Sequence, residues 1–180
     1  MINKTIRNAD FVLRFLRVPS QIGAISPSSS SLSEAIKQGL QVMQNFSSNS
    51  DVVELGAGTG GLTRCLEYTN FTAVEIDHVF CEHLRKRFPE KKIINASAIS
   101  YLQKLENPCY LISSIPLIRN PMAEEFKETI KAGYSAGLIL GLATYTYGYK
   151  SPFRNCGFSD EVRFRTVLRN LPPAQVWIYR

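Results

Sequence analysis

The sequence predicts an α/β fold in which a mostly parallel sheet of seven strands is covered by helices on both faces. From residue 51 onward, short apolar runs alternate with segments whose apolar residues recur at helical spacing. Such alternation is typical of a parallel sheet with crossover helices. The chain then ends in two extended runs joined by a short turn that contains Pro172 and Pro173. This ending predicts an antiparallel hairpin that closes the sheet.

Each element follows from its local pattern. The predicted strands span residues 51–55, 71–75, 92–95, 110–113, 137–143, 162–168 and 174–179. The predicted helices span residues 1–18, 32–43, 62–68, 79–88, 98–105 and 122–132. Ser31 and Glu34 form a capping box that predicts a helix start at residue 32.

Length and composition indicate one soluble domain over residues 1–180. No apolar run approaches the roughly 20 residues that cross a bilayer. Arg14 and Arg17 interrupt the apolar run that a cleaved signal needs, so we expect a cytoplasmic protein. The 4 cysteines are widely spaced and have no histidine at ligand spacing, so we expect reduced thiols and no metal site. The net charge of +6 favours an anionic partner, either nucleic acid or an acidic membrane surface.

A glycine-rich loop follows the first predicted strand, in the letters DVVELGAGTGG at 51–61. A strand, a glycine loop and a helix start together form a binding site for nucleotide-like ligands. Two patterns fit these glycines. The dinucleotide pattern G-x-G-x-x-G matches Gly56, Gly58 and Gly61, and the G-x-G-x-G pattern of S-adenosylmethionine (SAM) enzymes matches Gly56, Gly58 and Gly60. Glu54 favours SAM, because a carboxylate opposes a diphosphate but suits an ammonium and a sulfonium.

Polar residues at the ends of the next two strands extend this site. Glu75 can accept hydrogen bonds from both ribose hydroxyls, and Ile76 would lie against the adenine face. A surface Glu at a strand end is the alternative. Asp77 can simply cap the following helix. Ser97 follows the third strand, where an adenine-edge contact is expected.

The fourth and fifth strands lead to the candidate acceptor site. Enzymes that methylate a planar exocyclic amine usually carry a four-residue motif here: Asn or Asp, then Pro-Pro or Leu-Pro, then an aromatic residue that stacks on the base. Here Ser114 replaces the Asn or Asp and Leu117 replaces the aromatic, which argues against a nucleobase. The tyrosines of the segment 144–152 can hold an ammonium by their faces, while their hydroxyls and nearby cations can hold a phosphate. Tyrosines packed on the sheet are the alternative.

The first 18 residues form an amphipathic pattern with cations beside the apolar arc. Such a helix is typical of an interfacial membrane anchor, and a helix packed on the domain is the alternative. The residues predicted to bind membrane are Lys4, Arg7, Phe11, Arg14, Phe15 and Arg17.

With these residues in view, nearly the full chain resembles the bacterial phosphatidylethanolamine N-methyltransferases, which are related to ribosomal RNA adenine dimethylases. The resemblance rests on GAISPSS at 23–29, VELGAGTG at 53–60, VEID at 74–77, SSIP at 113–116, TYG and SP within 146–152, and NLPPAQVW at 170–177. It implies the class I SAM-methyltransferase, Rossmann-like fold, with SAM as cofactor. Ser97 departs from the usual acidic residue at its position, which puts the adenine contact in doubt.

The resemblance also implies roles for individual residues. The segment 19–31 is expected to fold over the cofactor. Cofactor contacts are expected at Ile25, Ser28, Ser29, Glu54, Gly56, Ala57, Gly58, Thr59, Gly60, Glu75, Ile76, Ser97 and Ala98. Substrate contacts are expected at Pro116, Tyr145, Tyr147, Lys150 and Arg154.

The expected reaction is methylation of the headgroup amine of phosphatidylethanolamine, and of its methylated intermediates toward phosphatidylcholine. Ser113 and Ser114 would orient the amine, and Tyr147 or water would take its proton. The resemblance implies peripheral attachment to an anionic membrane, at the inner face of the cell membrane. No nucleic acid is favoured, and no obligate protein partner is implied. A ribosomal RNA adenine N6-methyltransferase and a non-catalytic SAM-binding, membrane-associated protein are the two rival hypotheses.

Overall fold

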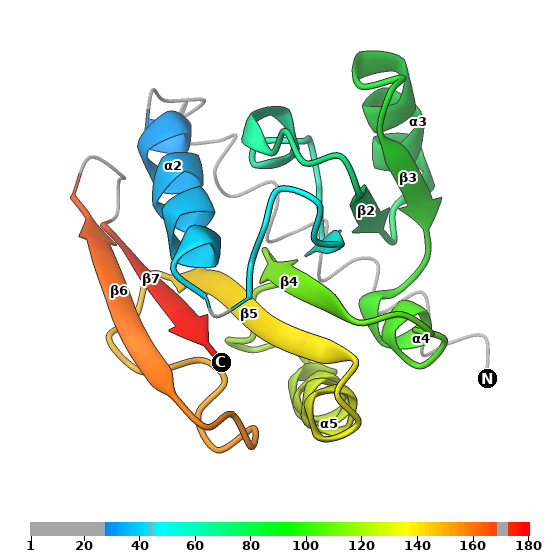
Figure 1. Cartoon of the computed structure of the whole chain (residues 1–180). Helices are drawn as coiled ribbons and strands as arrows, with labels where there is room; N and C mark the ends of the chain where they lie inside the picture. The colour runs from blue at the N-terminus through cyan, green and yellow to red at the C-terminus, as the bar shows by residue number, and fades with distance from the viewer. Residues whose placement is uncertain (1–27, 44, 169–172) are drawn as a thin grey trace.

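The computed structural model describes residues 28–43, 45–168 and 173–180 (Figure 1). Its strands are β1 (Val52–Leu55), β2 (Phe71–Glu75), β3 (Lys92–Asn95), β4 (Cys109–Ser113), β5 (Ile139–Thr146), β6 (Glu161–Val167) and β7 (Ala174–Tyr179). They form a 7-stranded sheet in the order β3-β2-β1-β4-β5-β7-β6. Both pairs that include β7 are antiparallel and the others are parallel. The predicted fold class and terminal hairpin are therefore confirmed.

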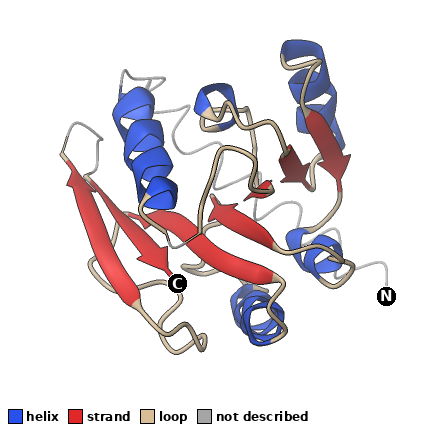
Figure 2. Cartoon of the chain, in the orientation of Figure 1, coloured by secondary structure: helices blue, strands red, loops and turns tan. Residues whose placement is uncertain are grey.

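Helices cover both faces of this sheet, as Figure 2 shows. One face carries α2 (Ser28–Gln41), the 3-10 helix η1 (Thr63–Cys65) and α3 (His78–Arg87). The other carries α4 (Ala98–Leu102) and α5 (Ala123–Ser135). We call these the α2 face and the α5 face. None of the helices in the described part of the chain combines the length and apolar composition that a membrane crossing requires.

The alternation of side chains along β1 and β2 decides which face carries the two buried glutamates. Val52 packs in the core of the α2 face, and Val53 packs in the core of the α5 face. Since successive side chains of a strand point to opposite faces, Glu54 points to the α2 face. Ala73 also packs there, so Glu75, two residues later, shares that face.

The predicted helix over residues 62–68 is wrong, because the structure has only the short η1 there. The bonds of this turn are of the i to i−3 type, from Cys65 N–H to Leu62 and from Leu66 N–H to Thr63. The Leu66 carbonyl then accepts from Lys91 Nζ at 2.6 Å. A tertiary hydrogen bond thus takes the acceptor that the next helical turn would use.

The start of α2 also differs from the prediction. The helix begins at Ser28, so Ser31 lies inside it and the capping box is wrong. Glu34 Oε1 instead accepts from Gln38 Nε2 at 2.8 Å, one helical turn later. Residues 28–31 of the predicted cofactor-covering loop therefore belong to a helix.

Two other boundaries affect the site. β5 continues to Thr146, so Tyr145 belongs to a strand rather than to the loop that the sequence suggested. α4 ends at Leu102, before the predicted end at residue 105.

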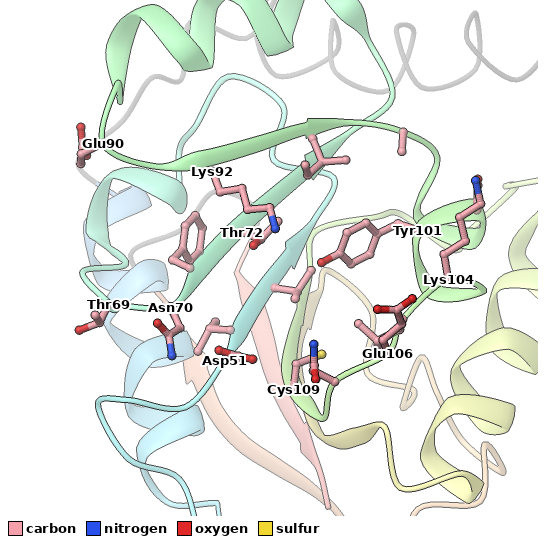
Figure 3. A pocket seen from close by; sticks show the side chains of 18 residues that line it. Asp51, Thr69, Asn70, Thr72, Glu90, Lys92, Tyr101, Lys104, Glu106 and Cys109 are labelled. Carbon is pink, nitrogen blue, oxygen red and sulfur yellow. The ribbon is translucent and has the colours of Figure 1, made fainter.

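The short α4 leaves part of the α5 face open over the strands β1 to β3. A cavity of about 740 Å³ lies there, toward the amino-terminal ends of the strands. Figure 3 shows Tyr101 of α4 and Lys92 of β3 directed into it. Asp51 and Cys109 line its lower side. The described side chains that were predicted to bind cofactor or acceptor do not line this cavity.

Candidate functional site

The glycine loop after β1 has the backbone that a G-x-G-x-G pattern requires. Gly56, Gly58 and Gly60 have φ angles of +77°, +54° and +82°, which glycine adopts without steric cost. Gly61 is not among the glycines with positive φ, and a Cβ there would meet nothing within 4 Å. The backbone therefore selects the spacing of SAM enzymes over that of dinucleotide enzymes.

Two of these glycines also pack closely against other elements. A Cβ on Gly60 would lie 2.7 Å from Phe88 and 2.8 Å from Leu84 of α3. A Cβ on Gly56 would lie 2.8 Å from Ile115, in the candidate acceptor loop. The glycine loop is thus held between α3 and the acceptor loop. Within it, Ala57 is buried and Thr59 is exposed.

Glu75 fastens the end of β2 to the glycine loop. Its Oε2 accepts from the Gly58 N–H at 2.7 Å, and its Oε1 accepts from the Asp77 N–H at 2.9 Å. Burial raises the pKa of this carboxyl, although both hydrogen bonds oppose the shift. Each oxygen keeps a lone pair for a ribose hydroxyl, so the structure adds a positioning role to the predicted one.

Asn95 supports this corner, and sequence reasoning assigned it no role. Its Nδ2 donates to the carbonyls of Glu75 and Ile76, both at 3.0 Å. The one available signal was a polar residue at the end of an apolar strand. By holding the end of β2, Asn95 sets the direction of Ile76, whose side chain is 39% exposed and so available to an adenine face.

Glu54 is a fully buried acid at 1% exposure. Its Oε2 accepts from the Thr63 hydroxyl of η1 at 2.6 Å. Burial raises the pKa of Glu54 to about 8, with a smaller contribution from nearby Glu75. The ligand-free carboxyl is therefore largely protonated at pH 7, which differs from the standing negative charge that the sequence suggested. A cationic ligand beside it would favour the ionised form.

Two polar side chains at strand ends cap helices: Asp77, as the sequence suggested, and Ser97, which was predicted to contact adenine. Asp77 caps α3, and its Oδ1 accepts from Val79 and Phe80 N–H at 2.8 and 3.2 Å. Ser97 caps α4, and its Oγ accepts from Ser100 N–H at 3.1 Å. The adenine contact stays a prediction: the adenine amino group would donate to the second lone pair of Ser97 Oγ or to a backbone carbonyl. Ala98 is the first residue of α4 and is half-buried.

The acceptor side is built on Ser113 and Ser114 at the end of β4. The Ser113 side chain is buried, and its carbonyl accepts from Thr144 Oγ1 at 2.8 Å. No sequence pattern had indicated this role for Thr144. Ser114 Oγ is buried and makes no hydrogen bond of regular geometry among the described residues, although it lies close enough to the Tyr145 hydroxyl to lower the pKa of that group. Pro116, in the same loop, is half-buried.

Tyr145 connects this acceptor side to the cofactor side. Burial raises the pKa of its hydroxyl, and nearby Tyr147 and Glu54 add to the shift while contact with Ser114 opposes it. The Tyr145 and Tyr147 rings meet edge to face with centroids 6.0 Å apart. Tyr147 is 45% exposed. The structure therefore brings Ser114, Tyr145 and Tyr147 together, within electrostatic range of Glu54.

Other predicted residues lie elsewhere or outside the described part of the chain. Figure 1 shows the segment after β5 running along the sheet to the start of β6. Arg154 Nε lies 3.9 Å from Glu161 Oε1 at that start, so Arg154 is not brought to the acceptor side. Lys150 is exposed. Ile25, the loop before Ser28 and the predicted membrane helix with its six contact residues lie outside the described residues, and Ser28 and Ser29 form the first turn of α2.

Comparisons with known proteins agree with this geometry. No family model matches the chain. It is 25% identical over 186 residues to the ornithine lipid N-methyltransferase of Singulisphaera acidiphila, with 94% of each chain covered.

Two solved structures share the arrangement of elements. A magnesium protoporphyrin IX methyltransferase from Synechocystis PCC 6803 with bound SAM superposes at TM-score 0.61, with 15% identity, over 94% of this chain and 84% of that one. A dimethyladenosine transferase from Plasmodium falciparum superposes at TM-score 0.59, with 15% identity, over 86% of this chain and 61% of that one. With the strand order and the reversed terminal strand, these likenesses establish that the chain has the class I SAM-dependent methyltransferase fold.

Proposed function

We propose that the protein is a SAM-dependent N-methyltransferase of a lipid headgroup amine, with phosphatidylethanolamine and its methylated forms as acceptors. The observation that carries the proposal is the meeting of Glu54, on the cofactor side, with Ser114, Tyr145 and Tyr147 on the acceptor side. The relative from Singulisphaera acidiphila, named for methylating ornithine lipid, supports a lipid amine as acceptor. The protein would act at the inner face of the cell membrane.

S-adenosyl-L-methionine is the cofactor, and the residues present fit it. The glycine loop offers close backbone approach at Gly56 and Gly58. Glu54 would face the cationic end, Glu75 the ribose and Ile76 the adenine. When bound, SAM supplies an electrophilic methyl group whose carbon bonds to the amine nitrogen as its bond to sulfur breaks, leaving S-adenosylhomocysteine and one proton from the amine.

The acceptor residues bind and orient the amine. Ser114 Oγ lies beside the Tyr145 hydroxyl, and it keeps a lone pair that can accept from an amine N–H. The raised pKa of Tyr145 keeps its hydroxyl protonated, so Tyr145 serves as a donor rather than as a base. Tyr147 is more exposed and lies beside it, so Tyr147 or a water molecule takes the proton. The aromatic faces also suit a nitrogen that becomes quaternary.

An RNA adenine methyltransferase is the second candidate, favoured by the likeness to a dimethyladenosine transferase. Ser114 and Leu117 count against it, because they replace the amide and the aromatic residue that hold a base. Several cations that could bind RNA also bind this chain's own backbone. Arg87 donates to Thr59 O at 3.3 Å and Lys91 to Leu66 O at 2.6 Å.

The test supplies methyl-labelled SAM with three acceptors in parallel: vesicles of phosphatidylethanolamine and phosphatidylglycerol, the same vesicles with ornithine lipid, and total RNA. We expect label in methylated phosphatidylethanolamine. Label in ornithine lipid alone would keep the lipid amine and replace the named acceptor. Label in RNA alone would overturn the proposal, and label in no acceptor would favour a non-catalytic SAM-binding protein.

Variants test the roles within the site. Ser114→Ala and Tyr147→Phe are each expected to lower kcat by about tenfold or more, the effect of losing roughly one hydrogen bond to the reacting amine. Tyr134→Phe is the matched control, because its hydroxyl lies 3.3 Å from Ser159 Oγ, away from the site. Unchanged turnover in both site variants would remove these residues from the mechanism.

A further inference from the structure

Exposed apolar side chains gather at the edge of the sheet that carries the site. The described residues expose 8 large hydrophobic side chains, and those of Ile76, Val79, Ile118, Tyr147, Tyr149 and Leu168 follow the carboxyl ends of β2, β4, β5 and β6. The most exposed are Tyr149 at 80%, Leu168 at 73% and Ile118 at 66%. Scattered exposed apolar residues need no explanation, but a group on one edge marks an interaction surface.

Strand pairing shows how the loops that follow β4, β5 and β6 are arranged along this edge. Ser113 at the end of β4 pairs with Thr144 of β5. Thr146 at the end of β5 pairs with Gln175 of β7, which in turn pairs with Thr166 of β6. The ends of β5 and β6 are therefore level, with one strand between them, roughly 10 Å apart. The loop of Tyr149 thus lies between that of Ile118 and that of Leu168.

Cations accompany these apolar residues. Arg119 and Lys150 directly follow Ile118 and Tyr149 in sequence, and Arg165 lies on the exposed side of β6. All three are exposed. Two acids near this edge have partners of their own: Asp77, next to Ile76, accepts from the Val79 and Phe80 N–H groups, and Glu124 in the first turn of α5 pairs with Lys127 at 2.9 Å. Exposed apolar side chains with exposed cations beside them match the apolar and anionic layers of a bilayer surface.

We propose that Ile118, Tyr149 and Leu168, with Arg119, Lys150 and Arg165, form a rim that rests on an anionic bilayer with the site facing the lipid. The inference rests on the proposed lipid acceptor. It gives the catalytic domain its own membrane contact, separate from residues 1–18. A rim so placed lets a headgroup amine reach Tyr147 and Ser114 while its acyl chains stay in the bilayer. Lipid then reaches the site without crossing water.

The first test compares two multiple variants of the full chain. The rim variant carries Ile118→Ser, Tyr149→Ser and Leu168→Ser. The control carries Val42→Ser and Leu140→Ser, which are also exposed apolar residues but lie at the opposite edge, at the end of α2 and the start of β5. Binding is measured by co-sedimentation with vesicles of phosphatidylethanolamine and phosphatidylglycerol. We expect at least a tenfold loss for the rim variant and less than a twofold change for the control.

Activity separates the rim from the site itself. The rim variant should lose methyl transfer to these vesicles in proportion to its lost binding. Its SAM affinity and its transfer to monomeric dihexanoyl-phosphatidylethanolamine should stay within twofold of the wild type. Rim and control variants that bind vesicles as the wild type does, or that lose binding equally, would overturn the proposal.

A second measurement needs only a single substitution. Tyr149→Trp and Leu140→Trp each add an indole to the common background of half-buried Trp177. Brominated lipid should quench the Tyr149→Trp signal and leave that of Leu140→Trp at the background. Equal quenching, or none, would overturn the rim. If the Tyr149→Trp signal is quenched but the wild type methylates no lipid, the proposed function fails and the rim stands. If the wild type methylates lipid but the Tyr149→Trp signal is not quenched, the rim fails and the proposed function stands.

Discussion

At the scale of single residues, burial decides the chemistry of Glu54. Its carboxyl is 1% exposed and has one described hydrogen bond, from Thr63. One hydrogen bond does not replace the hydration that an ionised carboxylate loses on burial, so the pKa rises from 4.5 to about 8. The residue that looked like a fixed anion is a proton-binding site in the ligand-free protein.

This shift predicts how stability depends on pH. The folded-state pKa lies above the unfolded value, so the contribution of Glu54 to stability is fully present below about pH 4.5 and is lost as the pH rises through 8. We expect Glu54→Gln to match the wild type near pH 5 and to be more stable near pH 9, by on the order of a few kcal/mol. Urea unfolding without SAM at both pH values measures the difference. If the free energy of unfolding depends on pH in the same way for both proteins, ionisation of Glu54 does not destabilise the folded state, which would contradict this account.

At the scale of elements, the glycine loop is held as much by packing as by its own flexibility. Gly60 contacts α3 so closely that a Cβ has no room, Gly58 donates to Glu75 at the end of β2, and Gly56 lies against Ile115. The loop therefore links β1, β2, α3 and the acceptor loop. A change in any of these contacts should reach the cofactor and acceptor sides together.

Two neighbouring glycines provide a matched pair of substitutions. Gly60→Ala introduces both a left-handed φ and an overpacked contact with Phe88 and Leu84. Each effect costs roughly 1–3 kcal/mol, so we expect a loss of about 2–5 kcal/mol in the free energy of unfolding. Gly61→Ala has open space around its Cβ and should change stability by less than about 1 kcal/mol. Equal effects in chemical denaturation would contradict this account of the loop.

At the scale of the whole molecule, the two edges of the sheet differ in use. The carboxyl-terminal edge gathers the glycine loop, the acceptor residues and the apolar rim. The amino-terminal edge carries the cavity around Lys92 and Tyr101, which the short α4 leaves open. Segregating the site to the strand carboxyl ends is usual for open α/β sheets, and it leaves one edge free to face a bilayer.

The amphipathic pattern of residues 1–18 predicts a second membrane contact. Replacing Lys4, Arg7, Arg14 and Arg17 by Gln in the full chain should weaken binding to anionic vesicles by at least tenfold, since each cation near such a surface contributes about 1 kcal/mol. The loss should shrink as salt screens the wild type. SAM affinity, measured calorimetrically, should not change. If neither salt nor these substitutions changes vesicle binding, residues 1–18 would instead be a helix packed on the domain.

Much of the fold was predictable because it depends on local pattern. The alternation of strands and helices, the glycine spacing and the terminal hairpin are all carried by neighbouring residues. Strands β2 and β3 have the predicted bounds, and β1 agrees to within a residue. Predictions failed where a distant group competes, as where Lys91 takes the Leu66 carbonyl and ends the expected helix.

The candidate site divides in the same way. Glu75, Ser114 and Tyr147 could be found from their places at strand ends, because parallel strands bring those ends to one edge. Only the tertiary structure decided that burial raises the pKa of Glu54, that Thr144 holds Ser113, and that Arg154 lies beside Glu161. Burial and long-range contacts set these properties, and they depend on residues far apart in the chain, whose proximity no local sequence pattern encodes.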